Sequence, residues 1–323
     1  MDALSEVLRV LHLTSGIFLE VKFTAPWCVD SAPDRGENSP FRDADHVAIY
    51  HLLTEGSCRV QLVSGGETID LKAGDLILFP HGDAHRIGSD LLRAPVDFKT
   101  LVEPSPTGGL ERIDHGGGGA RTRFVCGYVA CDGRLSKPLL GALPRMLRVP
   151  LGDHPESSWI IANVQRGAAE THAPRPGSAA LLGRLAELVF VEAMRQYIQS
   201  LPESQQGWLA GLRDPHIGRA LALLHADPAR DWKVESLAAE VGLSKTALND
   251  RFVSLIGDPP MQYLTGWRMA LASQMLSATS DGVARIAERV GYESEAAFNR
   301  AFKREFGSPP AAWRRGVRLA RSA

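Results

Sequence analysis

The chain has 323 residues, of which 44% are hydrophobic and 23% charged, and its formal net charge is −1. This length allows two domains with separate cores, and this composition is ordinary for a water-soluble globular protein. The chain has no run of about 18 apolar residues and starts with acidic rather than basic residues, so we expect a cytoplasmic protein without a membrane partner.

Short apolar runs separated by turns dominate the first 140 residues. The runs lie at 47–50, 59–63, 68–71, 76–79 and 124–129, and glycine-rich turns occur at 64–66 and 116–119. Several short strands at this spacing are typical of a small β-barrel or β-sandwich. The sequence therefore predicts a β domain at the N-terminal end of the chain.

One segment of this region has a distinctive spacing of glycine, proline and histidine. Residues 74–85 follow the pattern G-x5-P-x-G-x2-H, in which Gly74 and Asp75 would form a hairpin turn. The segment resembles the second signature of cupin barrels. The first cupin signature, which normally supplies a His-x-His pair and a glutamate, is missing. We therefore expect a cupin-like barrel that is not an enzyme; the alternative is a metal-dependent cupin enzyme with a helical appendage.

Three histidines and one cysteine could converge inside such a barrel. His51 precedes residues 55 and 56, and His81 and His85 follow the apolar run at 76–79. Together with Cys126 they would offer three imidazole nitrogens and one thiolate, a ligand set suited to Zn²⁺ or another divalent metal. The alternative is that these histidines are hydrogen-bonded core residues.

The cysteines are too few for a disulfide scaffold, since the chain has four: Cys28, Cys58, Cys126 and Cys131. Cys126 and Cys131 are the candidate redox-active pair. Their odd separation on one strand would place them on opposite faces, so they would need a bulge to pair. A Cys58–Cys126 or Cys28–Cys58 bridge is equally open, and so are four buried, inert thiols.

The sequence periodicity becomes helical near residue 179. Residues 179–198 predict a helix of about five turns, in which Leu181, Leu185 and Leu188 recur at helical spacing. The wide apolar stripe needs partners on more than one side, either a second subunit or the barrel of the same chain. We predict a sensing and dimerisation domain over 1–201 that forms a homodimer, then a linker over 202–214 with one short helical turn.

The last hundred residues contain one pattern twice. The first copy runs from Leu237 through Gly242 to Pro260, and the second from Ile286 through Gly291 to Pro310. The offset is 49 residues up to the glycine and 50 after it, so the extra residue lies in the turn, where an insertion costs least. Each copy predicts two short helices joined by a turn.

Each copy also contains the residues that such a helix pair needs. A glycine ends the first helix in the left-handed conformation, a serine caps the second, and two apolar residues four apart face the core. These positions are Gly242, Ser244, Leu248 and Phe252 in the first copy and Gly291, Ser294, Phe298 and Phe302 in the second.

Polar residues around these helices are the candidate DNA contacts, because Asn, Arg and Lys supply donors to base edges and phosphates. Residues 215–323 also carry 15 Lys and Arg against 11 Asp and Glu, whereas the rest of the chain is acidic. The candidates are Ser244, Lys245, Thr246, Asn249, Arg251, Arg268, Ser294, Glu295, Asn299, Arg300, Lys303 and Arg304.

The segment from Trp232 to Arg314 resembles the DNA-binding domain of AraC-type transcriptional regulators, and residues 286–310 match that family's signature nearly throughout. The resemblance implies an all-α domain over 215–323, in which a linker helix from about Met261 to Leu276 joins two helix-turn-helix units. Their second helices would enter successive major grooves about 34 Å apart. The first of these helices has few long basic side chains.

Residues 25–27, 55–58 and 116–128 resemble a cupin subgroup of the same regulators, some members of which respond to oxidants through cysteines. The predicted fold class is α+β, with an N-terminal cupin-like β-barrel and flanking helices before the all-α domain. We expect a sequence-specific DNA-binding transcriptional regulator whose barrel senses a small ligand, a metal or an oxidant. Its expected partners are double-stranded promoter DNA, a small-molecule effector, RNA polymerase and a second copy of the chain.

Overall fold

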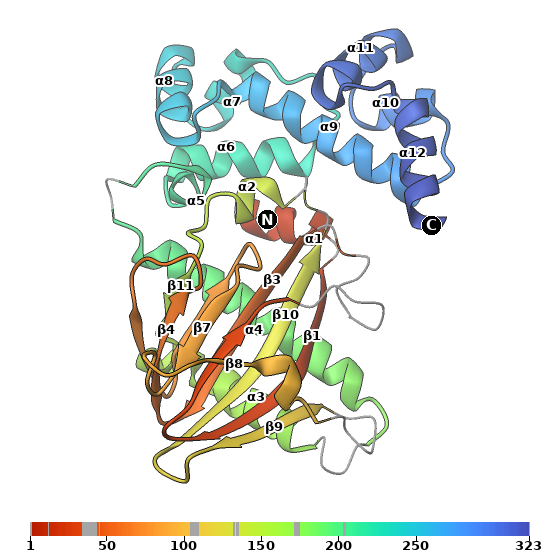
Figure 1. Cartoon of the computed structure of the whole chain (residues 1–323). Coiled ribbons are helices and arrows are strands. Elements are labelled where there is room, and N and C mark those ends of the chain that lie inside the picture. Colours follow the sequence, from red (N-terminus) through yellow and green to blue (C-terminus); the bar gives the residue numbers. More distant parts are fainter. Residues whose placement is uncertain are drawn as a thin grey trace. The chain divides into compact units, whose positions relative to one another are not determined.

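A computed structural model describes residues 2–11, 13–33, 44, 46–103, 110–131, 133, 136–170, 175–202 and 205–322 (Figure 1). The chain divides into two compact units. We call Leu13–Cys131 with Leu143–Ser200 the sheet unit, and Met1–His12, Asp132–Ala142 and Leu201–Ala323 the helical unit. Two segments of the expected sensing domain, residues 1–12 and 132–142, thus group with the C-terminal helices. Residues 203 and 204 of the expected linker lie outside the described residues.

The sheet unit contains two β-sheets. One sheet has the strand order β11-β6-β3-β10-β1-β9 and the other β5-β4-β7-β2-β8. Every apolar run singled out in the sequence lies in or overlaps one of these strands. The bounds are β1 (Thr14–Thr24), β2 (Cys28–Ser31), β3 (His46–Glu55), β4 (Ser57–Leu62), β5 (Ile69–Lys72), β6 (Leu76–Phe79), β7 (His85–Gly88), β8 (Val96–Asp97), β9 (Glu111–Gly116), β10 (Arg121–Cys131) and β11 (Leu147–Val149).

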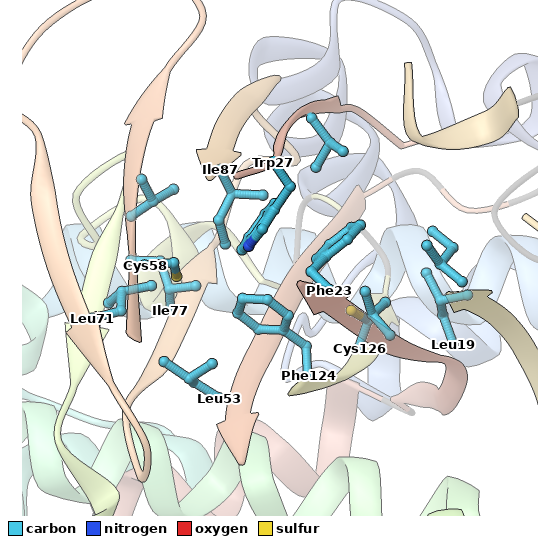
Figure 2. Close-up of a cluster of buried hydrophobic side chains, with 14 of the residues drawn as sticks. Leu19, Phe23, Trp27, Leu53, Cys58, Leu71, Ile77, Ile87, Phe124 and Cys126 are labelled. Atoms are coloured by element: carbon cyan, nitrogen blue, oxygen red, sulfur yellow. The ribbon is translucent and has the colours of Figure 1, made fainter. Parts of the chain in front are cut away.

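Apolar side chains from both sheets form one core (Figure 2). Phe23 stacks on Trp27 with ring centroids 4.1 Å apart, and Phe124 meets Trp27 edge-on at 6.0 Å. Because side chains alternate along a strand, the buried Val21 and Phe23 of β1 leave Lys22 on the outer face of the six-stranded sheet. Burial of each large apolar side chain of this kind contributes about 2 kcal/mol to the free energy of folding.

The predicted turn at Gly74 and Asp75 is present, but the predicted hairpin is wrong, because the turn connects β5 of the five-stranded sheet to β6 of the six-stranded sheet. Gly74 has a φ of +93°, and a Cβ there would lie 2.8 Å from the Cα of Gly152, so a side chain has no space. Asp75 is buried, accepts from the backbone N–H of Lys72 at 2.8 Å, and receives two hydrogen bonds from Arg148 at 2.9 and 3.0 Å. The turn is therefore fixed by steric exclusion and by an ion pair whose carboxylate is buried.

Two helices cover the six-stranded sheet: α3 (Ser158–Glu170) and α4 (Ser178–Ser200). Helix α4 packs on β1 and on α3, and α3 also contacts β10. Leu182, Leu185 and Val189 form part of the buried face of α4, whereas Leu181 and Leu188 are 45% and 43% exposed. The predicted helix is confirmed, and the sheet of the same chain, one of the two alternative partners for its apolar stripe, packs against it.

The helical unit contains two similar helix pairs joined by one long helix, α9. The pairs are α7 with α8 and α10 with α11, and the expected linker helix is confirmed as α9. Within the described residues no helix is long and apolar enough to cross a bilayer. The bounds are α1 (Ala3–Leu11), α2 (Lys137–Leu140), α5 (Trp208–Gly211), α6 (Pro215–Ala226), α7 (Val234–Glu240), α8 (Lys245–Ile256), α9 (Pro260–Ala278), α10 (Val283–Arg289), α11 (Glu295–Phe306) and α12 (Pro310–Ser322).

The helix pairs begin and end where their residues predict. Gly242 and Gly291 follow α7 and α10 with φ of +73° and +82°, in the left-handed region. The hydroxyls of Ser244 and Ser294 accept the backbone N–H groups three residues on, each at 3.2 Å. The apolar residues predicted to face the core, among them Phe252, are buried in both pairs. A serine cap is worth about 1 kcal/mol, so these ends are specified locally.

Candidate functional site

Helix α11 presents a row of cations on its exposed face. Arg300, Lys303 and Arg304 are exposed, whereas Phe298 and Phe302 are fully buried on the opposite side. Residues three and four apart lie on one face of a helix, so the three positive charges are neighbours. None of them forms an ion pair with another described residue, and their charges are therefore available to an external anion.

The remaining candidates on α11 lie at its start and along its side. Glu295 is exposed in the first turn, Asn299 is partly exposed, and the hydroxyl of Ser294 is used as the helix cap. In a helix that enters a major groove, the N-terminal residues reach the base edges. Helix α11 therefore carries exposed polar groups in its first turn and cations further along the same helix.

The cations of α8 are both engaged within the helical unit. The ammonium of Lys245 lies 2.7 Å from the Glu235 carboxylate, and the hydrogen bond from Lys245 lowers the Glu235 pKa. Arg251 donates to Asp214 at 2.6 Å. Thr246 is exposed, Asn249 is partly exposed, and the hydroxyl of Ser244 caps the helix. Helix α8 thus carries no uncompensated positive side chain among its described residues.

Arg268 on α9 also has structural partners. Its Nε donates to the carbonyl oxygen of Pro228 at 2.6 Å, and a terminal nitrogen donates to that of Arg230 at 2.8 Å. Its guanidinium lies 5.9 Å from the ring centre of Tyr292, which follows α10. Arg251 and Arg268, both expected as DNA contacts, therefore hold parts of the helical unit together. Arg315 on α12 is also exposed, although it was not among the predicted contacts.

A buried hydrogen-bonded chain joins His51, His85 and Cys126 in the sheet unit. His51 Nδ1 lies 2.9 Å from Cys126 Sγ, and His51 Nε2 lies 2.8 Å from His85 Nε2. His85 Nδ1 donates to the carbonyl oxygen of Asp83 at 3.0 Å, because a carbonyl can only accept. His85 Nε2 then accepts from His51 Nε2–H, and the Cys126 thiol donates to His51 Nδ1.

Burial keeps this chain neutral. It lowers the pKa of His51 well below its usual value and that of His85 to about 4. It also raises the pKa of the Cys126 thiol. The ring of Phe79 stacks on His85 with centroids 3.6 Å apart, which excludes water from one side. At neutral pH the three side chains are therefore uncharged and mutually satisfied.

The four predicted metal ligands do not all converge. His81 points elsewhere, with its Nε2 at 3.2 Å from the carbonyl oxygen of Leu143. His51 uses a different nitrogen toward each of its two neighbours, so no single point faces a lone pair from all three remaining groups. Within the described part of the chain, no group of three or more His, Cys, Asp or Glu residues is arranged to hold a metal ion. The arrangement does not fit the predicted four-ligand site.

The four cysteines, including the candidate redox pair Cys126 and Cys131, are buried and form no disulfide. Burial also raises the pKa of the Cys28 and Cys58 thiols. A thiol must ionise to become a strong nucleophile. The redox hypothesis therefore stays a prediction, and the structure contains neither of the alternative bridges.

Comparisons with known proteins match both halves of the chain. A cupin family model matches residues 2–199, and a helix-turn-helix domain model matches residues 237–316. A putative AraC-like transcription regulator from Streptomyces lividans is 32% identical over 98% of both chains. The HTH-type transcriptional regulator AlkR from Acinetobacter baylyi is 30% identical, over 97% of this chain and 99% of its own.

A third relative and one solved structure extend the comparison. The RCS-specific HTH-type transcriptional activator RclR from Escherichia coli is 28% identical, over 98% of this chain and 99% of its own. The DNA-binding domain of AdpA, solved in complex with a target DNA, is 33% identical with a TM-score of 0.33, and covers 34% of this chain and 97% of its own.

Proposed function

Because the chain belongs to the AraC-like transcription regulators with an N-terminal cupin domain, we propose that it binds double-stranded promoter DNA through two helix-turn-helix units. The helix pairs α7–α8 and α10–α11 are these units, and the two sheets serve as a cupin barrel that senses an effector. The relatives are named as transcription regulators, so we propose a regulator and not an enzyme. It would act in the cytoplasm, with RNA polymerase as a further partner.

Helix α11 makes the larger electrostatic contribution to DNA binding. The single observation that carries this proposal is the row of Arg300, Lys303 and Arg304, which is exposed and has no acidic partner among the described residues. Each cation that neutralises a phosphate releases a counterion and strengthens binding. On α8, Lys245 must first leave Glu235, and Arg251 must leave Asp214. Helix α8 therefore contributes mainly through Thr246 and Asn249.

The chain forms a homodimer through the exposed face of α4. Leu181 and Leu188 lie seven residues apart, on one side of the helix, and remain 45% and 43% exposed after α4 has packed on its own sheet. Such a spacing is typical of helix–helix seams. The double variant Leu181→Glu/Leu188→Glu should be monomeric in sedimentation analysis, whereas an unchanged mass would place the interface elsewhere.

Selection from random duplex DNA tests the function. We expect the full chain to enrich one site and to protect two major-groove faces about 10 base pairs apart. Affinity for that site should fall steeply as salt rises from about 50 to 200 mM, because phosphate contacts release counterions. Failure to enrich any duplex, with a protein shown to be folded, would contradict the proposal.

A further inference from the structure

Helix α9 joins the two helix pairs of the helical unit (Figure 1), and the pairs also contact each other directly. The contact lies between the loop at 227–233, which connects α6 to α7, and Gly291, which follows α10. A Cβ on Gly291 would lie 2.6 Å from the carbonyl oxygen of Ala229 and 2.8 Å from its Cα. Both atoms belong to the backbone, so the two segments meet at a distance that excludes a side chain at position 291.

The matching glycine of the first copy has no such contact. Gly242 has a φ of +73°, close to the +82° of Gly291. A Cβ on Gly242, however, would meet nothing within 4 Å among the described residues beyond its chain neighbours. The left-handed backbone alone therefore accounts for Gly242, whereas Gly291 is also required by the approach of the first pair's loop.

Arg268 on α9 holds this loop in place. It donates to the carbonyl oxygens of Pro228 and Arg230, the residues on either side of Ala229, at 2.6 and 2.8 Å. Hydrogen bonds from a charged donor are stronger than neutral ones. The same guanidinium lies 5.9 Å from the ring centre of Tyr292, within the range of cation–π attraction. One side chain therefore contacts the loop of the first pair and the turn of the second.

The loop is also bonded to itself and to α7. The indole N–H of Trp232 donates to the carbonyl oxygen of Asp227 at 2.9 Å, and Trp232 is buried. The Arg230 guanidinium lies 4.0 Å from the centre of the Trp232 ring and donates to Glu240 of α7 at 2.6 Å. A displacement of Ala229 would therefore break contacts that also position α7.

We propose that Arg268 and Gly291 fix the distance between α8 and α11, and thereby the one spacing of major-groove contacts that the protein accepts on DNA. Arg268 is then a positioning residue, which acts through the loop and the turn. One added base pair moves the second groove segment by about 3.4 Å and rotates it by about 35°. Helix pairs locked by a backbone contact cannot follow this displacement, whereas pairs joined by α9 alone would turn at the segments 257–259 and 279–282. The inference rests on the proposed function, because it requires both pairs to enter DNA.

The test uses the full chain and the duplex selected from random DNA, with one base pair inserted or removed midway between the two protected faces. Anisotropy gives the ratio of the dissociation constant for each shifted duplex to that for the selected duplex. In the wild type this ratio should be at least about tenfold, because a misplaced helix loses base contacts. Arg268→Met and Gly291→Ala should each reduce it below about threefold, because a helix pair that can shift recovers such contacts.

Two further variants are controls for these changes. Gly242→Ala strains a left-handed backbone in the same way as Gly291→Ala but meets no atom of the other pair. Arg251→Ala removes an arginine that is bonded to the cap of α6 and not to the second pair. Both should keep the wild-type ratio, and circular dichroism shows whether each variant is folded. If Gly291→Ala does not fold, Arg268→Met decides the test.

Two outcomes would overturn the inference. One is that Arg268→Met weakens binding to all three duplexes equally, which would make Arg268 a DNA contact. The other is that the wild type binds all three spacings with the same affinity. Both outcomes leave the proposed function standing, because DNA binding itself is observed. If the folded wild type binds none of the duplexes, the proposed function fails as well.

Discussion

Arg251 on α8 donates to the Asp214 carboxylate that caps α6. This one carboxylate therefore links the start of α6 to the side of α8. Burial raises the Asp214 pKa, but hydrogen bonds from Arg251 and from two backbone N–H groups outweigh burial and lower it below its usual value. Asp214 therefore stabilises the fold above its unfolded pKa of about 3.9, and this contribution is lost as the pH falls through the lower folded pKa.

Replacing Arg251 should affect stability more than DNA binding. Arg251→Ala should lower the free energy of unfolding by about 0.5–1 kcal/mol, because the Arg251 side chain is half exposed and solvent screens the pair. The DNA affinity of the folded variant should stay within about threefold of the wild type. Urea unfolding and fluorescence anisotropy on one preparation measure both. A large loss of affinity at unchanged stability would instead make Arg251 a DNA contact.

The serine caps should contribute equally in the two helix pairs. Ser244→Ala and Ser294→Ala should each destabilise the helical unit by about 1 kcal/mol, because each removes the acceptor of one N–H group at 3.2 Å. Urea unfolding followed by far-ultraviolet circular dichroism measures the change. A much larger effect for one serine would mean that its hydroxyl has another role besides capping.

Local features of the helical unit could be predicted from the sequence. The caps at Ser244 and Ser294 and the left-handed glycines act within one helical turn, and the repeat places them in register. The partners of Arg251 and Arg268 could not be predicted, because Asp214 and Pro228 lie about 40 residues earlier and only the fold brings them close. Outward position on a helix does not reveal whether a neighbouring element compensates a charge.

In the sheet unit, too, local features could be predicted from the sequence but contacts between distant residues could not. Short apolar runs between turns predicted β3, β4, β5, β6 and β10, and the pattern at 74–85 predicted the turn. His51, His85 and Cys126 meet because β3 lies beside β10 and the sheets face each other, which the sequence could only suggest. His81 lies just before β7, and its ring turns to the carbonyl of Leu143. The grouping of α1 with α6 depends on long-range packing that periodicity does not encode.

The buried histidines should make stability depend on pH. Burial lowers the pKa of His85 and of His225 in the helical unit to about 4, whereas unfolded histidine titrates near 6.5. Between pH 6.5 and 4 the unfolded state therefore binds more protons than the folded state. As the pH is lowered through that window, the free energy of unfolding falls by up to about 1.4 kcal/mol per pH unit for each histidine.

Two matched variants assign this dependence. His85→Phe should flatten the pH dependence of sheet-unit unfolding, and His225→Phe that of helical-unit unfolding. Guanidinium unfolding at pH 7, 6 and 5 measures each slope. An unchanged slope in His85→Phe would mean that the ring is protonated, or exposed to water, in the folded protein.

The thiols should react slowly in the folded protein. All four are buried, and burial raises the pKa of Cys126, which donates to His51. An aromatic disulfide reagent should modify them at least tenfold faster after unfolding. On the same samples, the redox hypothesis predicts that Cys126→Ser alters the response of promoter binding to hydrogen peroxide. An identical response in variant and wild type would contradict that hypothesis.

Anisotropy with the selected DNA site tests most directly the claim that α11 makes the larger electrostatic contribution to DNA binding. Arg300→Ala and Lys303→Ala should each lower affinity about tenfold and reduce the slope of log affinity against log salt by about 1. Lys245→Ala on α8, whose ammonium already pairs with Glu235, should change affinity less than threefold. Wild-type binding by both α11 variants, or a larger loss in Lys245→Ala, would contradict the account.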